Sequence, residues 1–318
     1  MKLFVTGGAG FIGSNYVRHV LGTTDDEVLV YDALTYAGNT STLQDVADNP
    51  RYSFIKGDIT DRDAVVDAMK GCDTVVHFAA ESHVDRSIVD PDQFVHTNCL
   101  GTNVVMDVAR GHGVERVIHI STDEVYGSIA EGSFSETDRL DPRSPYSASK
   151  AGSDLIALSY LSTYGLPVIV TRSSNNFGPW QYPEKVIPLF VTNLLEGQKV
   201  PLYGDGLNVR DWCYVADNCA AVDLIVRKGT IGEIYNIGAG NEIPNRELTN
   251  RILALMGGGE EMVQYVEDRL GHDRRYSIDT SKVEALGWRP ARGLDEALAE
   301  TVAWYRENTW WWGPLKSP

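Results

Sequence analysis

The sequence predicts an α/β fold, in which a doubly wound parallel sheet is followed by a smaller C-terminal α+β substrate lobe. Short apolar, β-rich runs alternate with helical stretches over residues 1–171, which is typical of βαβ units whose strands are buried on both faces. After residue 175, turn residues such as the run Gly257–Gly259 break this rhythm. We therefore expect one lobe over residues 1–174 and a second over residues 175–318.

Six apolar runs are expected to form the strands of the first lobe, at 3–5, 28–31, 52–55, 74–78, 116–120 and 167–171. Apolar residues at helical spacing predict helices between them, at 14–21, 61–70, 92–111 and 146–164. Some later segments are expected to return to this lobe. The candidates are the strands near 200–203 and 233–237 and the helical stretch near 168–198.

The composition excludes some classes of partner. The 318 residues include 44 acidic and 28 basic ones, a formal charge of −16. Polymeric nucleic acid and anionic lipid surfaces need clustered Lys and Arg, so neither is an expected partner. The first residues enter a glycine-rich turn too soon for a signal peptide, and no run of 18 apolar residues follows. We expect a cytoplasmic protein without a membrane segment.

The four cysteines show no spacing typical of a metal site or of a disulfide framework. They are Cys72, Cys99, Cys213 and Cys219. We expect buried free thiols and no metal. His77, at the end of an expected strand, is interpreted as a core residue.

A glycine-rich turn after the first strand predicts a dinucleotide site. Gly7, Gly10 and Gly13 stand in the segment GGAGFIGS. Gly7 permits a tight turn, Gly10 lets backbone N–H groups approach a pyrophosphate, and Gly13 allows close packing of helix on strand. The spacing is GxxGxxG and not GxGxxG. The flanking strand and helix and the acidic residue Asp32 nevertheless favour a Rossmann-type NAD-binding domain.

Asp32 ends the second strand and is expected to select the cofactor. Its carboxylate can accept hydrogen bonds from ribose hydroxyls and would repel a 2′-phosphate, and residues 33–40 contain no Arg or Lys. This predicts NAD and not NADP. Asp58, after the third strand, has two candidate roles, a contact with the adenine amino group or the N-cap of a helix.

Tyr146 and Lys150 lie four residues apart at the start of an expected helix, so both project from one face. The run Ser-Thr-Asp-Glu at 121–124 follows the strand 116–120, at the sheet edge where open α/β folds bind ligands. The Lys150 ammonium and a positive nicotinamide ring are both expected to lower the pKa of the Tyr146 phenol. The phenolate could then take a hydroxyl proton during oxidation of an alcohol.

Seven motifs, in order along essentially the whole chain, resemble those of the dTDP-glucose 4,6-dehydratases, a family of extended short-chain dehydrogenases/reductases. They are GGAGFIGS, HFAAESHVDRS (77–87), STDEVYG (121–127), SPYSASK (144–150), SNNFGPWQYPEKVIP (174–188), PLYGDGLNVRDW (201–212) and GHDRRY (271–276). STDEVYG is the most specific, because the family pattern of sugar epimerases in this superfamily lacks its Asp-Glu pair. Phe177 and Val186 stand where Tyr and Leu are usual, which bears on substrate tuning and not on the reaction.

The resemblance implies a hydro-lyase that converts dTDP-glucose into dTDP-4-keto-6-deoxyglucose with NAD. It implies that Tyr146 begins oxidation at sugar C4, and that Lys150 and Thr122 hold Tyr146 and O4. Glu124 would remove the C5 proton and Asp123 would protonate the departing C6 hydroxyl, after which hydride returns to C6. Adjacent carboxyl groups can serve as base and acid only if their pKa values differ.

The expected site residues form two groups. Cofactor contacts are expected from Gly7, Gly10, Phe11, Ile12, Gly13, Asp32, Leu34, Thr35, Asp58, Ile59, Phe78, Ala79, Ala80, Ser82, Thr97, Tyr146, Lys150 and Asn176. Substrate contacts are expected from Ser82, Thr122, Asn175, Lys185, Val186, Pro201, Tyr203, Arg210, Asn245, Arg269 and His272. In the family, the matching Asn, Lys and Arg positions line the nucleotide and its pyrophosphate, and the stretch 268–272 closes the site. Glu81 and His83 are weaker candidates.

Two other functions stay open. A nucleotide-sugar C4 epimerase is disfavoured by the pair Asp123 and Glu124, and an NAD-sensing regulatory module is disfavoured by the intact Tyr146 and Lys150. The helices near 92–111 and 146–164 match those of a four-helix dimer interface in the family, which implies a homodimer. The run Trp310–Trp312 could bind carbohydrate, but its terminal position favours packing of the tail onto the body.

Overall fold

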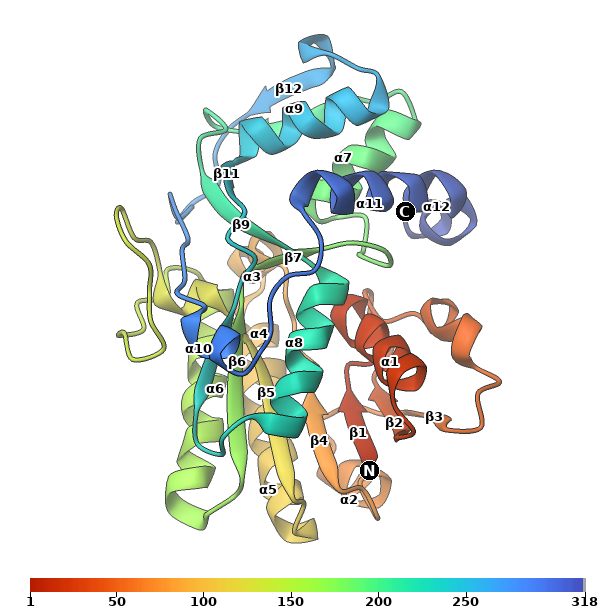
Figure 1. Cartoon of the computed structure of the whole chain (residues 1–318), viewed down its shortest axis with the longest axis vertical. Coiled ribbons are helices and arrows are strands. Elements are labelled where there is room, and N and C mark those ends of the chain that lie inside the picture. Colours follow the sequence, from red (N-terminus) through yellow and green to blue (C-terminus); the bar gives the residue numbers. More distant parts are fainter. Residues whose placement is uncertain (317–318) are drawn as a thin grey trace.

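The computed structural model describes residues 1–316 and contains a seven-stranded parallel sheet (Figure 1). In sheet order, its strands are β10 (Ile234–Ile237), β6 (Val168–Ser173), β5 (Arg116–Thr122), β4 (Thr74–His77), β1 (Lys2–Thr6), β2 (Glu27–Asp32) and β3 (Tyr52–Lys56). All six predicted strands are present, and the predicted fold class is confirmed. The chain order reverses between β1 and β4, the switch point at which open α/β sheets bind ligands.

Helices cover both faces of this sheet because its strands are apolar on both sides. Leu3 and Val5 of β1 point to one face and Phe4 to the other. The helices on the first face are α1 (Phe11–Thr23) and α8 (Val215–Lys228). Those on the second are α2 (Arg62–Ala68), α5 (Thr102–His112) and α6 (Pro145–Tyr164). The predicted helix 92–111 consists of α4 (Pro91–Phe94), a π-helical segment (Val95–Gly101) and α5, and α3 (Val84–Val89) precedes it.

A second group of elements lies beyond the carboxyl edge of the large sheet (Figure 1). Its strands are β7 (Asn175–Phe177), β9 (Val209–Tyr214) and β11 (Glu242–Pro244) in one sheet, and β8 (Val200–Tyr203) and β12 (Val263–Val266) in another. Its helices are α7 (Val186–Leu195), α9 (Asn245–Met256), α11 (Leu294–Glu307) and α12 (Thr309–Lys316). The short elements of the chain include α10 (Ser281–Ala285) and the 3-10 helices Thr40–Val46, Asp123–Tyr126 and Glu260–Met262.

Of the segments expected to return to the large sheet, only one does so as predicted. β10 does so, and it lies beside β6 as an edge strand. The expectation for 200–203 is wrong, because β8 pairs with β12 and buries Val200 and Leu202 in the core of the second group. The stretch 168–198 is not one helix, since it contains β6, β7 and α7.

Helix α6 begins where the sequence supplies a cap. Ser144 Oγ accepts the N–H of Ser147 at 3.0 Å, and Ser147 Oγ accepts the N–H of Ser144 at 3.0 Å, which is a capping box with Pro145 at the first helical position. Gly165 ends the helix with a φ of 71°. The cap places Tyr146 in the first turn, at the carboxyl edge of β5 and β6.

The C-terminal tail packs onto the second group of elements. Trp311 and Trp312 are each 4% exposed, whereas Trp310 is 52% exposed. The Trp311 ring lies 5.3 Å from that of Trp180. The expected packing of the tail therefore fits the structure better than a carbohydrate platform does.

Within residues 1–316, no helix is long and apolar enough to cross a membrane, and no group of three or more His, Cys, Asp or Glu could hold a metal ion. The four cysteines are free; Cys99 is half-buried and the other three are buried. His77 is a core residue, with its ring nitrogens 2.6 Å from Thr6 Oγ1 and 3.0 Å from Thr102 Oγ1.

Candidate active site

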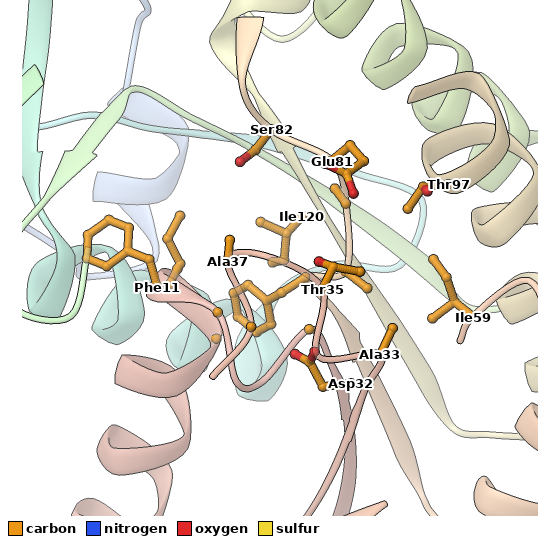
Figure 2. Close-up of a pocket in the computed structure, with 18 of the residues that line it drawn as sticks. Phe11, Asp32, Ala33, Thr35, Ala37, Ile59, Glu81, Ser82, Thr97 and Ile120 are labelled. Carbon is orange, nitrogen blue, oxygen red and sulfur yellow. The ribbon is translucent and has the colours of Figure 1, made fainter. Parts of the chain in front are cut away.

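A cleft opens at the carboxyl edge of the large sheet, at the switch point between β1 and β4 (Figure 2). It is lined by the turn after β1, the loops after β2, β3 and β4, the end of β5, the start of α6 and the segment 181–185. In Figure 2, Asp32, Thr35, Ile59 and Thr97 lie around this space. Segments far apart in the sequence thus meet at the place that the strand pattern predicts.

The glycine-rich turn has the shape of a pyrophosphate cradle. Gly7 has a φ of 68°, and a Cβ there would lie 2.6 Å from the backbone N of Ala79. A Cβ on Gly13 would collide with the carbonyl oxygen of Gly7. Gly10 caps α1 without a side-chain hydrogen bond, so the cap leaves the first N–H groups of the helix to other acceptors. The residues present therefore fit the pyrophosphate of NAD.

Asp32 lines the cleft and also fixes its walls. Its Oδ2 accepts the N–H of Ala9 at 2.9 Å, and its Oδ1 accepts the N–H of Leu34 at 2.8 Å. Burial raises the pKa of this carboxyl, and the two backbone N–H groups oppose the rise. A carboxylate has about four lone-pair sites, so Asp32 can still accept ribose hydroxyls.

Asp58 also lines the cleft, but it does not cap the following helix. Its Oδ1 accepts both the N–H and the hydroxyl of Thr60 at 2.8 Å. Asp61 caps α2 instead, because its Oδ1 accepts the N–H of Ala64 at 3.2 Å. The N-cap role for Asp58 is therefore wrong, and its contact with adenine stays a prediction.

Leu34 and Asn176 are the two expected cofactor residues that do not line the cleft. Leu34 lies in the adjoining turn with a φ of 54°. Asn176 Nδ2 donates to the backbone oxygen of Ser174 at 3.0 Å. The expected cofactor residues that line the cleft are Gly7, Gly10, Phe11, Ile12, Gly13, Asp32, Thr35, Asp58, Ile59, Phe78, Ala79, Ala80, Ser82, Thr97, Tyr146 and Lys150.

Tyr146 and Lys150 reach the cleft from the first turns of α6 and are 9% and 5% exposed. Lys150 Nζ donates to the backbone oxygen of Ile120 at 2.7 Å. Burial lowers the pKa of Lys150 to about 8. Lys150 is therefore mostly protonated at neutral pH and is fixed to the end of β5.

The charge state of Tyr146 differs from the expectation. Burial raises the pKa of its phenol, the negative charge of Glu124 raises it further, and a hydrogen bond with Thr122 lowers it. The expectation that Lys150 lowers the pKa of Tyr146 is wrong for the chain without a cofactor. Burial of the phenol has the largest effect on this pKa, and the Lys150 ammonium donates its hydrogen bond to the backbone oxygen of Ile120. The phenol needs a further positive charge in the cleft, and an oxidised nicotinamide ring carries one.

Asp123 and Glu124 lie on the 3-10 turn that follows β5. Asp123 is 3% exposed; its Oδ1 accepts the hydroxyl of Thr122 at 3.3 Å and its Oδ2 has no hydrogen-bond partner. Burial and the charge of Glu124 raise the pKa of Asp123 well above its usual range. Burial also raises the pKa of Glu124, but three nearby cations oppose the rise. The pKa of Asp123 is therefore raised more strongly than that of Glu124, so the turn favours Asp123 as the proton donor of the pair and Glu124 as the acceptor.

The three cations that act on Glu124 are Arg269, Arg210 and Lys185, all predicted from the sequence as substrate residues. Arg210 is 4% exposed, and it donates to the backbone oxygens of Val209 and Asp273 at 2.7 and 2.8 Å. Lys185 Nζ donates to the backbone oxygen of Ser82 at 2.7 Å. Residues from β9, from the segment before α7 and from the loop after β12 thus converge on one carboxylate. Within an acidic chain, this cluster provides a site for an anion.

Other expected substrate residues lie on the second group of elements. Asn175 on β7 and Asn245 on α9 each have a buried Oδ1 without a hydrogen-bond partner, a state that costs about 1–3 kcal/mol until a donor fills it. His272 Nδ1 lies 2.6 Å from Asp268 Oδ1, and burial and Arg269 lower the pKa of His272 to about 4. Val186 begins α7, and Pro201 and Tyr203 belong to β8.

Glu184 joins three segments at the cleft. Its Oε1 accepts the hydroxyl of Tyr36 at 3.0 Å, and its Oε2 accepts Nε of Arg86 at 3.2 Å. The Arg86 guanidinium lies 3.8 Å from the centre of the Tyr36 ring. We call these three residues the Glu184 clasp. It connects the loop after β2 with α3 and with the segment before α7, and Glu184 itself lines the cleft.

Several lining residues were not predicted from the sequence. They are Tyr31, Ala33, Ala37, Gly38, Gly57, Gln93, Ile120, Gln181, Tyr182 and Glu184, together with Glu81, which was only a weak candidate, and Ser121, which was placed at the ligand-binding edge without a role. Tyr182 and Glu184 lie in the segment SNNFGPWQYPEKVIP, whose position in a matching motif was their only signal.

Comparisons with known proteins agree with this site. A family model described as GDP-mannose 4,6 dehydratase matches residues 4–301. A dTDP-glucose 4,6-dehydratase of Streptomyces antibioticus is 55% identical over 323 aligned positions, which cover 99% of this chain and 96% of the relative. The chain belongs to the dTDP-glucose 4,6-dehydratase family. A second relative with that name, from Streptomyces niveus, is 52% identical and covers 100% of this chain and 96% of its own.

Solved structures place the dehydratase family within a wider group. The crystal structure of a dTDP-glucose 4,6-dehydratase from Streptomyces venezuelae, solved with NAD bound, matches with a TM-score of 0.98 at 54% identity, covering 99% of this chain and 100% of that one. A UDP-glucose 4-epimerase from Thermus thermophilus, also with NAD, matches with a TM-score of 0.88 at 33% identity, covering 96% and 99%. Epimerases therefore share the fold of the dehydratases at lower identity.

Proposed function

We propose that this chain is an NAD-dependent hydro-lyase that converts dTDP-glucose into dTDP-4-keto-6-deoxyglucose. The observation that carries the proposal is the pair Asp123 and Glu124, two adjacent carboxyl groups in different electrostatic surroundings, near Tyr146 and Lys150. The names of the relatives support dTDP-glucose as the substrate, and the NAD-bound structure of a relative supports the cofactor.

The first half of the reaction is oxidation at C4 of the sugar. When bound, NAD supplies the hydride acceptor for C4 and the hydride donor for C6. Tyr146 takes the proton of the C4 hydroxyl, and Thr122 stabilises its phenolate by a hydrogen bond. Lys150 contributes a positive charge in a site from which water is largely excluded.

The second half of the reaction is elimination of water across C5 and C6 and return of the hydride to C6. The ketone at C4 acidifies the C5 proton, and Glu124, whose carboxylate form the surrounding cations favour, removes it. Asp123, kept protonated by burial, gives its proton to the departing C6 hydroxyl, which leaves as water. Glu124 then returns its proton to C5 as C6 is reduced. The proton that Tyr146 took from O4 replaces the one that Asp123 gave to the departing water, so the net change is the loss of one water.

The test is incubation of the purified protein with dTDP-glucose, followed by mass spectrometry. We expect a product lighter by one water and no net change in the redox state of NAD. An unchanged mass with a galactose product would instead identify a C4 epimerase. Epimerisation at C4 needs Tyr146 and Lys150 but involves no proton transfer at C5 or C6, so it would not use Asp123 and Glu124. NAD binding without turnover would identify a regulatory module.

We also propose that the protein is a homodimer. Val95 and Leu100 of the π-helical segment and Leu155 of α6 are 54%, 45% and 61% exposed. The π-helical segment and α6 are in contact, so these exposed apolar side chains lie on adjoining elements, which favours a partner surface. Light scattering should give about twice the chain mass of 35.1 kDa, and L155E should reduce it toward a single chain. A wild-type mass near 35.1 kDa would contradict the dimer.

A cytoplasmic location is proposed as well. The four cysteines are unpaired in the structure, which suits a reducing compartment. Fractionation of the producing cells tests this, and recovery of the protein with the membrane or outside the cell would contradict it.

A further inference from the structure

Behind Tyr146 and Lys150 lies a buried network of charges that the proposed mechanism does not use. Asp154 follows Lys150 by one turn of α6, and neither Asp154 nor His119 of β5 has any exposed surface. Nε of Arg172, on β6, lies 2.9 Å from Asp154 Oδ2, and Nε2 of His119 lies 3.3 Å from Asp154 Oδ1. Buried charges cost several kcal/mol each unless they are paired, and an apolar substitute is often as stable. Stability alone therefore does not explain the network.

The network contacts Lys150 in two ways. Ser153 Oγ donates to the backbone oxygen of Lys150 at 2.8 Å, so this hydroxyl accepts Nε2–H of His119 at 3.1 Å. The next residue after His119, Ile120, accepts the Lys150 ammonium through its backbone oxygen at 2.7 Å. The main chain and the ammonium of Lys150 are thus both tied to consecutive residues of β5.

The network also reaches the turn that carries Asp123 and Glu124. Arg172 donates to the hydroxyl of Tyr126, in the same 3-10 turn, at 2.8 Å, and its guanidinium lies 4.7 Å from the centre of that ring. Arg172 therefore joins the helix of the oxidation residues to the turn of the elimination residues.

Among the groups around Lys150, Asp154 is the one that provides a negative charge. The titratable groups that interact with this ammonium are Asp154 on the same helix, His119 on β5, His77 on β4 and Cys99 in the π-helical segment. Burial lowers the pKa of Lys150, and Asp154 opposes this more than Cys99 does. Burial also lowers the pKa of both histidines, so they are neutral at pH 7. Burial raises the pKa of Asp154, but the Arg172 guanidinium, 2.9 Å from its Oδ2, opposes the rise and the pKa lies below its usual value, so Asp154 is ionised.

We propose that Asp154 is a positioning residue for Lys150. The Asp154 carboxylate, fixed by Arg172, keeps the Lys150 ammonium charged and in place in a buried site. Arg172 in turn holds the turn of Asp123 and Glu124 against α6. The inference rests on the proposed function, because it assigns Asp154 a part in the same reaction.

The first test compares D154N with the double variant D154N/R172M, both as holoenzymes. D154N leaves Arg172 buried without its partner and can unfold for that reason, whereas the double variant removes both charges together. The rate of water loss from dTDP-glucose is measured against pH. Loss of the Asp154 charge lowers the pKa of Lys150 further, so the alkaline limb of kcat should move to lower pH by about one unit in the double variant. KM should change less than kcat.

A second measurement does not depend on turnover. The titration of Lys150 is followed by the NMR shift of its 13C-labelled Cε, assigned with K150M, and the double variant should show the same displacement of about one pH unit. A wild type that titrates as expected but leaves dTDP-glucose unchanged would defeat the proposed function and not this inference. A double variant with the wild-type titration would show that Asp154 only balances Arg172, and would overturn the inference.

The variant Y126F tests the link through Arg172. It removes this hydrogen bond, together with the one that the Tyr126 hydroxyl donates to Asn236 Oδ1 at 2.9 Å, and leaves every charge of the network in place. We expect an unchanged alkaline limb and a fall of about fivefold in water loss relative to C4 oxidation, from the loss of about 1 kcal/mol. An unchanged ratio of the two steps would refute the coupling by Arg172.

Discussion

Asp123 and Glu124 are neighbours in the chain, yet their carboxyl groups lie in opposite electrostatic surroundings. Asp123 points into a buried space where one oxygen has no partner, and Glu124 points toward cations from three other segments. Adjacent residues on a tight turn necessarily diverge in direction, so a single turn can present an acid and a base to the same sugar.

The variant E124Q separates the two halves of the reaction. Glutamine keeps the shape of the side chain but cannot accept the C5 proton, so water loss should fall by at least about 100-fold. C4 oxidation uses Tyr146 and should remain visible as a change in nicotinamide absorbance. Dehydration at the wild-type rate by E124Q would refute the role of Glu124 as base.

The variant D123N tests the charge state of Asp123 through stability. The folded-state pKa of Asp123 is raised, so the wild type takes up a proton on folding between the ordinary carboxyl pKa and the raised value. Its stability is full below that window and falls as pH rises through it, by up to about 1.4 kcal/mol per pH unit. Asparagine cannot titrate, so D123N lacks this slope.

Urea unfolding of both proteins from about pH 5 to pH 8 measures the difference. We expect the stability of D123N relative to the wild type to rise with pH, while its water loss is strongly reduced at every pH. A relative stability that stays level across this range would mean that Asp123 is ionised in the folded protein.

The Glu184 clasp predicts the rate at which NAD leaves the cleft. E184Q weakens an ion pair worth up to about 1 kcal/mol and a hydrogen bond of similar value, so NAD release should become about tenfold faster. The measurement is loss of cofactor bound as NADH during rapid dilution, followed by the fluorescence of the reduced nicotinamide. E196Q is the matched control, because it breaks the pair of Glu196 with Lys316, outside the lining of the cleft. Equal release rates in the two variants would contradict the clasp.

The sequence was informative where a local pattern determines the structure. Apolar runs predicted every strand of the first lobe, and glycines predicted a turn in which Gly7 does take a positive φ. The Glu184 clasp joins residues 36, 86 and 184, and no local pattern signals a contact over such separations. The pKa of Tyr146 also escaped prediction, because it depends on burial and on where the Lys150 ammonium points.

The C-terminal tail allows a stability prediction in which the adjacent tryptophan is the control. Trp311 and Trp310 are adjacent, but Trp311 is 4% exposed and its ring nitrogen lies 3.3 Å from Thr42 Oγ1, whereas Trp310 is 52% exposed. W311A should lower the free energy of unfolding by about 3–5 kcal/mol, since it empties a packed site. W310A should cost about 1 kcal/mol or less, because much of its side chain stays in water. Urea unfolding measures both, and equal losses would mean that the tail contributes to stability through its helix and not through the buried indole.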